Sequence, residues 1–141
     1  MVKLLTMQKI MYDRSVNHAE NLMIRSLLQS EQERLLNLIH QIRTSGEVAP
    51  AYCWLTETSS TKGTKTYTYA VLVTQKPDRK PKSQSLGRPG SQRHRHWKDA
   101  LARREAIVEL EQQLAMLQAL MERQTRTWED LRISGLVNPG S

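Results

Sequence analysis

Residues 51–74 read AYCWLTETSSTKGTKTYTYAVLVT. The alternation of residue types at every second position in this stretch predicts two β-strands. Aromatic and β-branched residues recur at every second position in both halves, as in Tyr67, Tyr69, Val71 and Val73, which is typical of half-buried strands. The SSTKGTK segment between the halves has the composition of a turn. Because an isolated hairpin is marginal in water, we expect KSQSLG (82–87) to return as a third strand. The predicted sheet region is 50–88.

A helix is predicted before this sheet, over residues 17–45. Leu, Ile and Met recur there at helical spacing, and Gly46 suits a left-handed position just after the helix. Ser30-Glu31-Gln32-Glu33 has the form of a capping box, so the pattern leaves open a kink or break near Ser30. It also leaves open whether residues 1–16, an N-terminal extension, are helical.

A longer helix is predicted after the sheet, over 91–134. Ser134-Gly135 closes it, and a tail follows at 135–141. Arg88-Pro89-Gly90-Ser91 fits a type II turn, and Ser91 suits the N-cap. From Ala100 onward apolar residues alternate at steps of three and four, which is the spacing of a coiled coil, with Arg103 and Gln124 interrupting it. The predicted assembly seam consists of Ile107, Leu110, Leu114, Leu117, Met121, Trp128 and Leu131.

These elements predict an α+β protein in which two long amphipathic helices pack antiparallel and flank a small two- or three-stranded antiparallel sheet. The apolar face of the first helix, Leu22 to Ile42, is shorter than the seam of the second. We therefore expect the distal seam, from Met121 to Leu131, to stay exposed unless residues 1–14 cover it. We also expect a homodimer in which the distal seams or the first helices meet.

The net charge is concentrated in residues 76–104. This segment holds ten of the 21 Lys and Arg and two of the 14 Asp and Glu, a net charge of +8 in a chain of +7. The remaining residues are therefore close to neutral. Such a basic segment favours an anionic partner, most often nucleic acid, although many charge runs are merely solvated loops.

Arg93 and Arg95 fall in the first turns of the predicted long helix, where positive side chains oppose the helix dipole. The same arrangement becomes favourable around a phosphate, because helix-terminal amides and Arg side chains can bind one anion. The predicted nucleic-acid-binding residues are Lys62, Lys65, Lys76, Arg79, Lys80, Lys82, Arg88, Arg93, His94, Arg95 and Lys98.

The hairpin offers a second candidate surface. Strand alternation places Tyr52, Trp54, Tyr67 and Tyr69 on one face. This face can simply pack on the helices, which is what we expect for Trp54. The alternative is that part of the sheet meets nucleic acid, since a β-ribbon fits the DNA major groove.

YTYAVLV, KSQSLGRPGS and HWKDALARREAIVELEQQL together resemble the three-stranded arm-type DNA-binding domains of integrases. They also resemble a small helix–hairpin–helix family of unknown function found among plasmid and transposon genes. The resemblance runs from Ala51 to Leu120, about half the chain, and implies DNA binding. The arm-type helix is short, whereas here it continues into the heptad seam.

Catalytic and metal-binding motifs are not found in the sequence. His94 and His96 are two residues apart and diverge on a helix, and the single cysteine, Cys53, suits a small buried strand residue in a reducing compartment. We therefore expect no enzyme activity, cofactor or metal, no membrane span, and a cytoplasmic location. The predicted function is that of a DNA-favouring, nucleic-acid-binding accessory or regulatory factor of a mobile-element or nucleoprotein system. The alternative is a coiled-coil adaptor whose basic segment docks an acidic protein.

Overall fold

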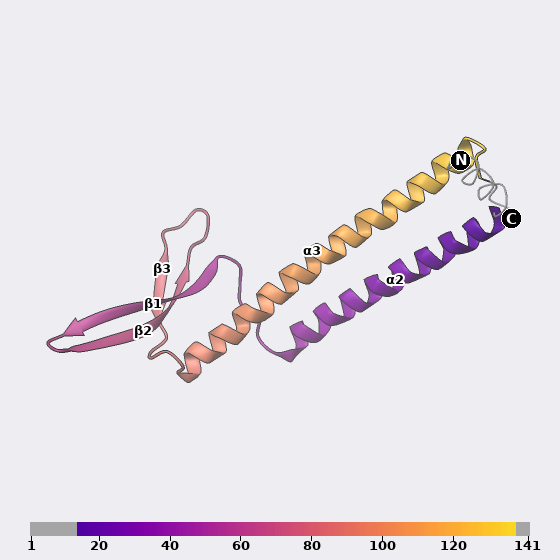
Figure 1. Cartoon of the computed structure of the whole chain (residues 1–141). Coiled ribbons are helices and arrows are strands. Elements are labelled where there is room, and N and C mark those ends of the chain that lie inside the picture. Colours follow the sequence, from indigo (N-terminus) through magenta and orange to yellow (C-terminus); the bar gives the residue numbers. More distant parts are fainter. Residues whose placement is uncertain (1–13, 138–141) are drawn as a thin grey trace, which may run out of the picture. The chain divides into compact units, whose positions relative to one another are not determined.

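A computed structural model describes residues 14–137, and the expectations for residues 1–13 and for the end of the tail lie outside them. The order of elements is α2 (Arg14–Ser45), β1 (Cys53–Lys62), β2 (Lys65–Thr74), β3 (Lys82–Ser85) and α3 (Gln92–Ile133) (Figure 1). The α+β class is confirmed, and residues 14–137 form two helices and one antiparallel sheet. Two compact units divide the chain: Leu38–Leu110, which contains the sheet, and a helical unit of residues up to Asn37 and from Glu111.

The sheet has three antiparallel strands in the order β1-β2-β3, so the third strand is confirmed. Lys62 pairs with Lys65, which leaves a two-residue turn, Gly63-Thr64. Gly63 has φ of 64° and Thr64 does not have a positive φ, the combination of a type II′ turn. This turn matches the right-handed twist of the strands and therefore fixes the register of the hairpin.

The core of the sheet-containing unit lies between one face of the sheet and the start of α3. It is built from small and aliphatic side chains, with Leu86 only 1% exposed and Leu55 and Trp97 packed at its margin. Its buried members are Ala49, Cys53, Ala70, Leu72, Leu86, Ala100 and Leu101. The buried Ala49, Ala70 and Ala100 allow the backbones to approach closely, and Ala49 N–H donates to the Ala100 carbonyl at 3.0 Å.

Both ends of α3 are capped as their sequences predict. Ser91 N–H donates to the Arg88 carbonyl and Gly90 has φ of 83°, as a type II turn requires. The Ser91 hydroxyl then accepts from the His94 amide at 3.3 Å, which is an N-cap bond. At the other end Gly135 has φ of 76°, and bonds from Gly135 and Leu136 back to the last turn complete a Schellman motif.

The end of α2 differs from expectation, because Gly46 does not adopt a left-handed conformation. A Cβ at this position would instead collide with the guanidinium of Arg103. That guanidinium donates to the Ser45 hydroxyl at 3.2 Å and to the Glu47 carbonyl at 3.1 Å. Gly46 therefore makes room for a side chain that satisfies carbonyl and hydroxyl groups just after the helix.

In the helical unit α2 and α3 pack antiparallel (Figure 1). Asn21 and Leu22 line a cavity with Gln124 and Trp128, so the early part of α2 lies beside the late part of α3. α2 continues through Ser30 without interruption, so the break near Ser30 that the sequence left open is not present. Arg34 donates to the Glu31 carboxylate at 2.6 Å within the helix, and this bond lowers the pKa of Glu31.

The distal seam is not left open as expected. Met121, Trp128 and Leu131 are half-buried, like Leu114 and Leu117 at the centre. Asn21 lines a cavity with Trp128 and Leu131, so the early part of α2 lies beside the end of α3.

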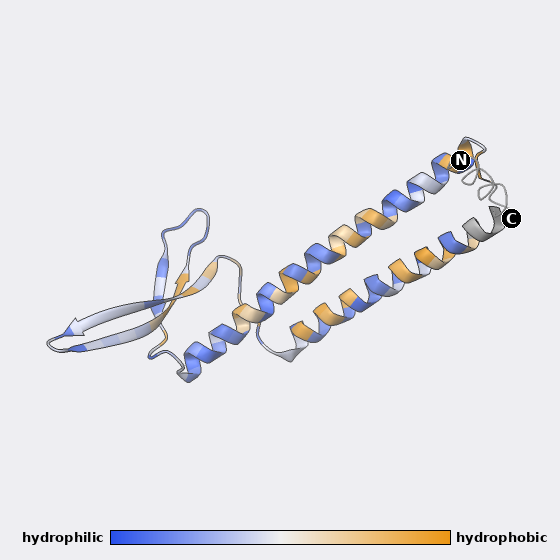
Figure 2. Ribbon diagram, viewed as in Figure 1, coloured by the Kyte–Doolittle hydropathy of each residue, from blue (hydrophilic) through white to orange (hydrophobic). Residues whose placement is uncertain are grey.

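Four of the exposed apolar residues lie beside the seam, whereas others, such as Leu36 and Ile133, are exposed elsewhere on the two helices. Met23 and Leu27 of α2 are 59% and 63% exposed, and Met116 and Leu120 of α3 are 73% and 49% exposed. Leu27 lies one turn before Glu31, and Glu31, Met116 and Leu120 line one groove between the helices. Figure 2 shows hydrophobic residues recurring along both helices. We call Met23, Leu27, Met116 and Leu120 the apolar flank.

Candidate nucleic-acid interface

The sheet has one covered face and one open face. The register puts Cys53, Ala70 and Leu72 on the face that packs against α3. We call the opposite face the open face; strand alternation assigns to it Trp54, Thr56, Thr58, Ser60, Lys62, Lys65, Tyr67, Tyr69, Val71, Val73, Ser83 and Ser85.

The aromatic residues of the open face are accessible, contrary to the expectation that Trp54 packs on the helices. Trp54 is 44% exposed, and Tyr67 and Tyr69 are each 37% exposed. Tyr52 was expected on the same face, but its φ of 67° takes it out of the strand just before β1 begins. Val71 is buried on the central strand, where it pairs with Thr56 and Ser85. Three large aromatic side chains therefore line a surface that α3 does not cover.

The outer half of the hairpin projects beyond the core as a two-stranded ribbon. All residues from Thr56 to Tyr67 are exposed, whichever face they occupy. In Figure 2 the hydrophobic residues of the sheet gather at the opposite end of the hairpin, and the outer half is hydrophilic. The ribbon is rich in Thr and Ser, and its cross-strand hydroxyl pairs include Ser59–Thr68 at 3.4 Å. Such pairs and the β-branched side chains stabilise strands that have no core beneath them.

Lys62 and Lys65 stand at the tip of this ribbon, directly opposite each other. Both belong to the open face, and both are exposed. The acid of the hairpin, Glu57, belongs to the other face by strand alternation. Like charges directly opposite one another destabilise a sheet, so the tip combines two cations without a local benefit to folding.

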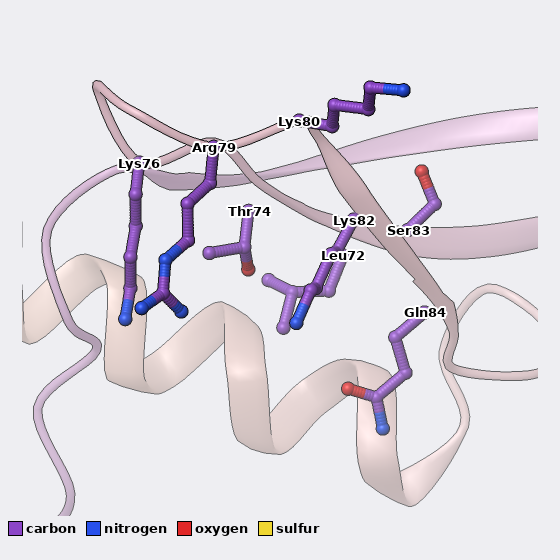
Figure 3. Close-up of a pocket in the computed structure, with 8 residues that line it drawn as sticks. All are labelled: Leu72, Thr74, Lys76, Arg79, Lys80, Lys82, Ser83 and Gln84. Carbon is purple, nitrogen blue, oxygen red and sulfur yellow. The ribbon is translucent and has the colours of Figure 1, made fainter.

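The basic residues after β2 divide between the two sides of the sheet. Figure 3 shows the side chains of Lys76, Arg79 and Lys82 extending to the helix-facing side, whereas Lys80 extends the other way. The division follows from strand alternation, because Lys82 pairs with Thr74 on the helix-facing side. Within residues 14–137 none of these four cations has an ion-pair partner.

The cations at the start of α3 form a third group, separate from those at the ribbon tip and those after β2. Arg88 lies in the turn, and Arg93, Arg95 and Lys98 are exposed on the first turns of the helix. His94, predicted to bind nucleic acid, has an internal role: its Nδ1 accepts from the Gly90 amide at 2.9 Å. The eleven predicted residues therefore do not form one continuous surface.

Two arginines of the basic segment have structural roles that the sequence does not reveal. Arg104 donates to the carbonyls of Pro50 and Cys53 at 2.6 and 3.0 Å, and Arg103 holds the end of α2 as described above. His96 contacts the Glu47 carboxylate at 2.7 Å. The residues in these contacts are between 49 and 58 positions apart in the sequence. Contacts of this kind leave no local sequence pattern, so they could not be predicted from residue spacing.

Replacing both Arg93 and Arg95 with Gln should weaken binding to all duplexes equally while leaving stability unchanged or slightly higher. Their charges oppose the dipole of α3, and each unfavourable charge of this kind costs roughly 0.3–1 kcal/mol. The checks are a thermal melt and a salt titration of binding, with exposed Arg126→Gln as the control. A lower melting temperature with intact binding would show that the two arginines are structural.

Comparisons with known proteins add no relative: no protein-family model, curated protein or solved structure matches this chain. Within residues 14–137, no three His, Cys, Asp or Glu side chains are grouped so that they could hold a metal ion. None of the helices described has the length and apolar character that crossing a membrane requires.

Proposed function

We propose that the protein binds duplex DNA, with the projecting ribbon of β1 and β2 in the major groove. The observation that carries this proposal is the open face, which exposes Trp54, Tyr67 and Tyr69 and ends at Lys62 and Lys65. An exposed surface that joins aromatic rings, hydroxyls and unpaired cations suits a polyanionic partner with flat apolar parts.

The dimensions of the ribbon favour DNA over RNA. The major groove of B-DNA is about 12 Å wide and admits a two-stranded β-ribbon, whereas the major groove of an RNA duplex is deep and narrow. Strands of 10 residues extend about 34 Å. The side chains of their outer halves are exposed, so no other part of the sheet-containing unit blocks entry of the ribbon into a groove. Thr and Ser hydroxyls along the ribbon can donate to phosphates or base edges, and the two tip lysines can bind phosphates.

We propose a binding role rather than catalysis. The imidazoles of His94 and His96 are engaged with Gly90 and Glu47. Cys53 is buried, and its Sγ lies 3.4 Å from the Arg104 guanidinium. These three groups, which could serve as base or nucleophile, are thus engaged in contacts within the protein. A buried free thiol also suits the reducing cytoplasm, which we propose as its location.

The biological role that we propose is an accessory or regulatory factor of a mobile-element or nucleoprotein system. The resemblance of KSQSLGRPGS and YTYAVLV to arm-type domains supports it, as do the three-stranded sheet and the helix behind it. The helical unit then provides an assembly surface.

We further propose that the protein is a homodimer that assembles through the apolar flank. A second copy is the favoured occupant because a two-fold axis pairs the flank with itself, and apolar meets apolar on both sides. Two copies would also present two open faces to one DNA, which raises the effective concentration of the second contact.

Light scattering in moderate salt should give about twice the chain mass of 16.3 kDa. Replacing Leu27 and Leu120 with Gln should produce monomer without a large loss of thermal stability, because both are largely exposed within one chain. Leu36→Gln is the matched control: Leu36 is 49% exposed but lies nine residues from Leu27, on the opposite side of α2. A monodisperse monomer at all micromolar concentrations contradicts the dimer.

The second candidate function is a protein-interaction adaptor, and the same apolar flank favours it. In that case the flank binds a different protein, and the basic segment docks an acidic surface of that partner. The two functions differ in their response to competitor DNA, which displaces a DNA ligand and leaves a specific protein partner bound.

A gel-shift series with labelled duplex DNA, single-stranded DNA and RNA duplex tests the proposed function. We expect the DNA duplex to bind most tightly, since the ribbon needs a wide groove. Equal binding of single strands would point to stacking on the exposed aromatics instead of groove insertion. Absence of a shift with all three ligands would leave the adaptor as the better account.

A further inference from the structure

A cavity of about 370 Å³ opens where β2 ends and β3 begins, on the helix-facing side of the sheet (Figure 3). It lies away from the open face, so the proposed groove contact does not use it. Three basic side chains extend on this side, those of Lys76, Arg79 and Lys82. The remaining lining residues are Leu72, Thr74, Lys80, Ser83 and Gln84.

Neutral hydrogen-bonding groups accompany the three cations. Thr74 pairs with Lys82 and Leu72 pairs with Gln84, so strand alternation brings the Thr74 hydroxyl and the Gln84 amide to the same side as Lys82. Leu72 is buried and contributes an apolar side chain to the cavity lining. The side chains of Lys80 and Ser83 extend away from the others, as alternation requires (Figure 3).

The cations of the cavity are not balanced from within the described part of the chain. The acid of the connecting loop, Asp78, forms no ion pair with them in residues 14–137. Three positive side chains around one concavity repel one another, and an anion removes that repulsion. Arg offers a planar fork and Lys a mobile point charge, a combination that suits the several oxygens of a phosphate.

We propose that this cavity binds one phosphate group, held by Lys76, Arg79 and Lys82 with hydrogen bonds from Gln84 and Thr74. A phosphate of the DNA backbone and a free phosphate ester share this chemistry. The backbone source rests on the proposed function, whereas binding of phosphate itself does not. If the backbone is the source, the cavity anchors DNA at the β2–β3 end while the ribbon occupies the groove.

The first arm of the test uses inorganic phosphate and the whole chain labelled with ¹⁵N. At constant ionic strength, phosphate should shift the Thr74, Arg79 and Gln84 amide resonances along a saturable curve. Lys82→Gln should weaken this binding at least tenfold, and Lys80→Gln should leave it nearly unchanged. Each variant removes one lysine charge, and the two lysines are only two positions apart in the sequence. They differ in the side of the sheet to which the side chain extends.

The second arm measures binding of a duplex with and without 5′-phosphates as salt is varied. If the backbone is the source, Lys82→Gln lowers the slope of log affinity against log salt by about 0.9, the value for one phosphate contact, and Lys80→Gln lowers duplex affinity less. A saturable phosphate shift with an unchanged duplex slope assigns the cavity to free or terminal phosphates.

Two results overturn the inference: no saturable shift with phosphate, or equal effects of Lys82→Gln and Lys80→Gln on it. Failure of the proposed function has a different signature. In that case the unaltered chain fails to bind duplex, while inorganic phosphate still shifts the cavity resonances.

Discussion

Replacing Lys62 and Lys65 with Gln is expected to weaken duplex DNA binding on the order of a hundredfold at physiological salt, about 1.4 kcal/mol for each lysine. The slope of log affinity against log salt should fall by about 1.8, which is 0.9 for each of two phosphates. The reason is their place at the tip of the projecting ribbon, on the open face, where no other cation of the hairpin can replace them.

The same variant should be as stable as the unaltered chain or slightly more stable. Lys62 and Lys65 pair directly across the hairpin, so their charges repel in the free protein. Arg123→Gln with Arg126→Gln is the control, because it removes two exposed charges from the helical unit. Fluorescence anisotropy of a labelled duplex gives the affinity, and a thermal melt gives the stability. Equal losses of affinity in both variants would mean that only total charge matters and that the ribbon has no special role.

The second large effect concerns folding of the sheet-containing unit. Leu86→Ala should lower the free energy of unfolding by about 2–5 kcal/mol, the usual cost of truncating a fully buried leucine. Leu86 is 1% exposed and lies in the core cluster with Leu72 and Ala100. Its amide donates to the Ala70 carbonyl at 2.8 Å, so it also continues the pairing of β3 with β2.

Urea denaturation followed by tryptophan fluorescence measures this loss, since Trp54 and Trp97 both lie in the sheet-containing unit. Leu36→Ala is the control, because Leu36 is 49% exposed and lies outside the apolar flank, so its truncation should cost less than about 1 kcal/mol. Similar, small effects of both substitutions would show that the sheet does not depend on the core described above.

Local patterns predict the secondary structure of this chain well. Period-2 alternation, the turn chemistry around Gly63 and the marginal stability of a lone hairpin together indicate three strands, and the sheet has three. The cap residue Ser91 and the terminal Gly135 each have the role that their position indicates. These features depend on neighbours within a few residues, which is why the sequence is sufficient for them.

The choice of the covered face could not be predicted in the same way, because both faces of β2 carry apolar residues. The face with Cys53 and Ala70 packs against Ala100 of α3, since small side chains allow a helix to approach closely. Trp54 and the tyrosines would hold the helix further away. Composition alone favours burying the larger residues, and this preference led to the wrong expectation for Trp54.

The basic segment illustrates a second limit. Charge counting treats Lys76–Arg104 as one surface, but strand alternation sends Lys80 and Lys82 to opposite sides of the sheet (Figure 3). Arg103 and Arg104 are used internally to hold the connection after α2. The contacts of Arg103 and Arg104 join residues more than fifty positions apart, and a single sequence gives no signal for them.

The salt dependence of duplex DNA binding tests the central claim most directly. Anisotropy of a labelled duplex should be measured with the unaltered chain between about 50 and 200 mM salt, the range over which phosphate contacts have a large effect. We predict a linear plot of log affinity against log salt with a slope of about −2 or steeper, since each phosphate contact adds about −0.9. Absence of binding at the lowest salt, or an affinity that does not change with salt, would contradict the proposal that this protein binds DNA through its basic ribbon.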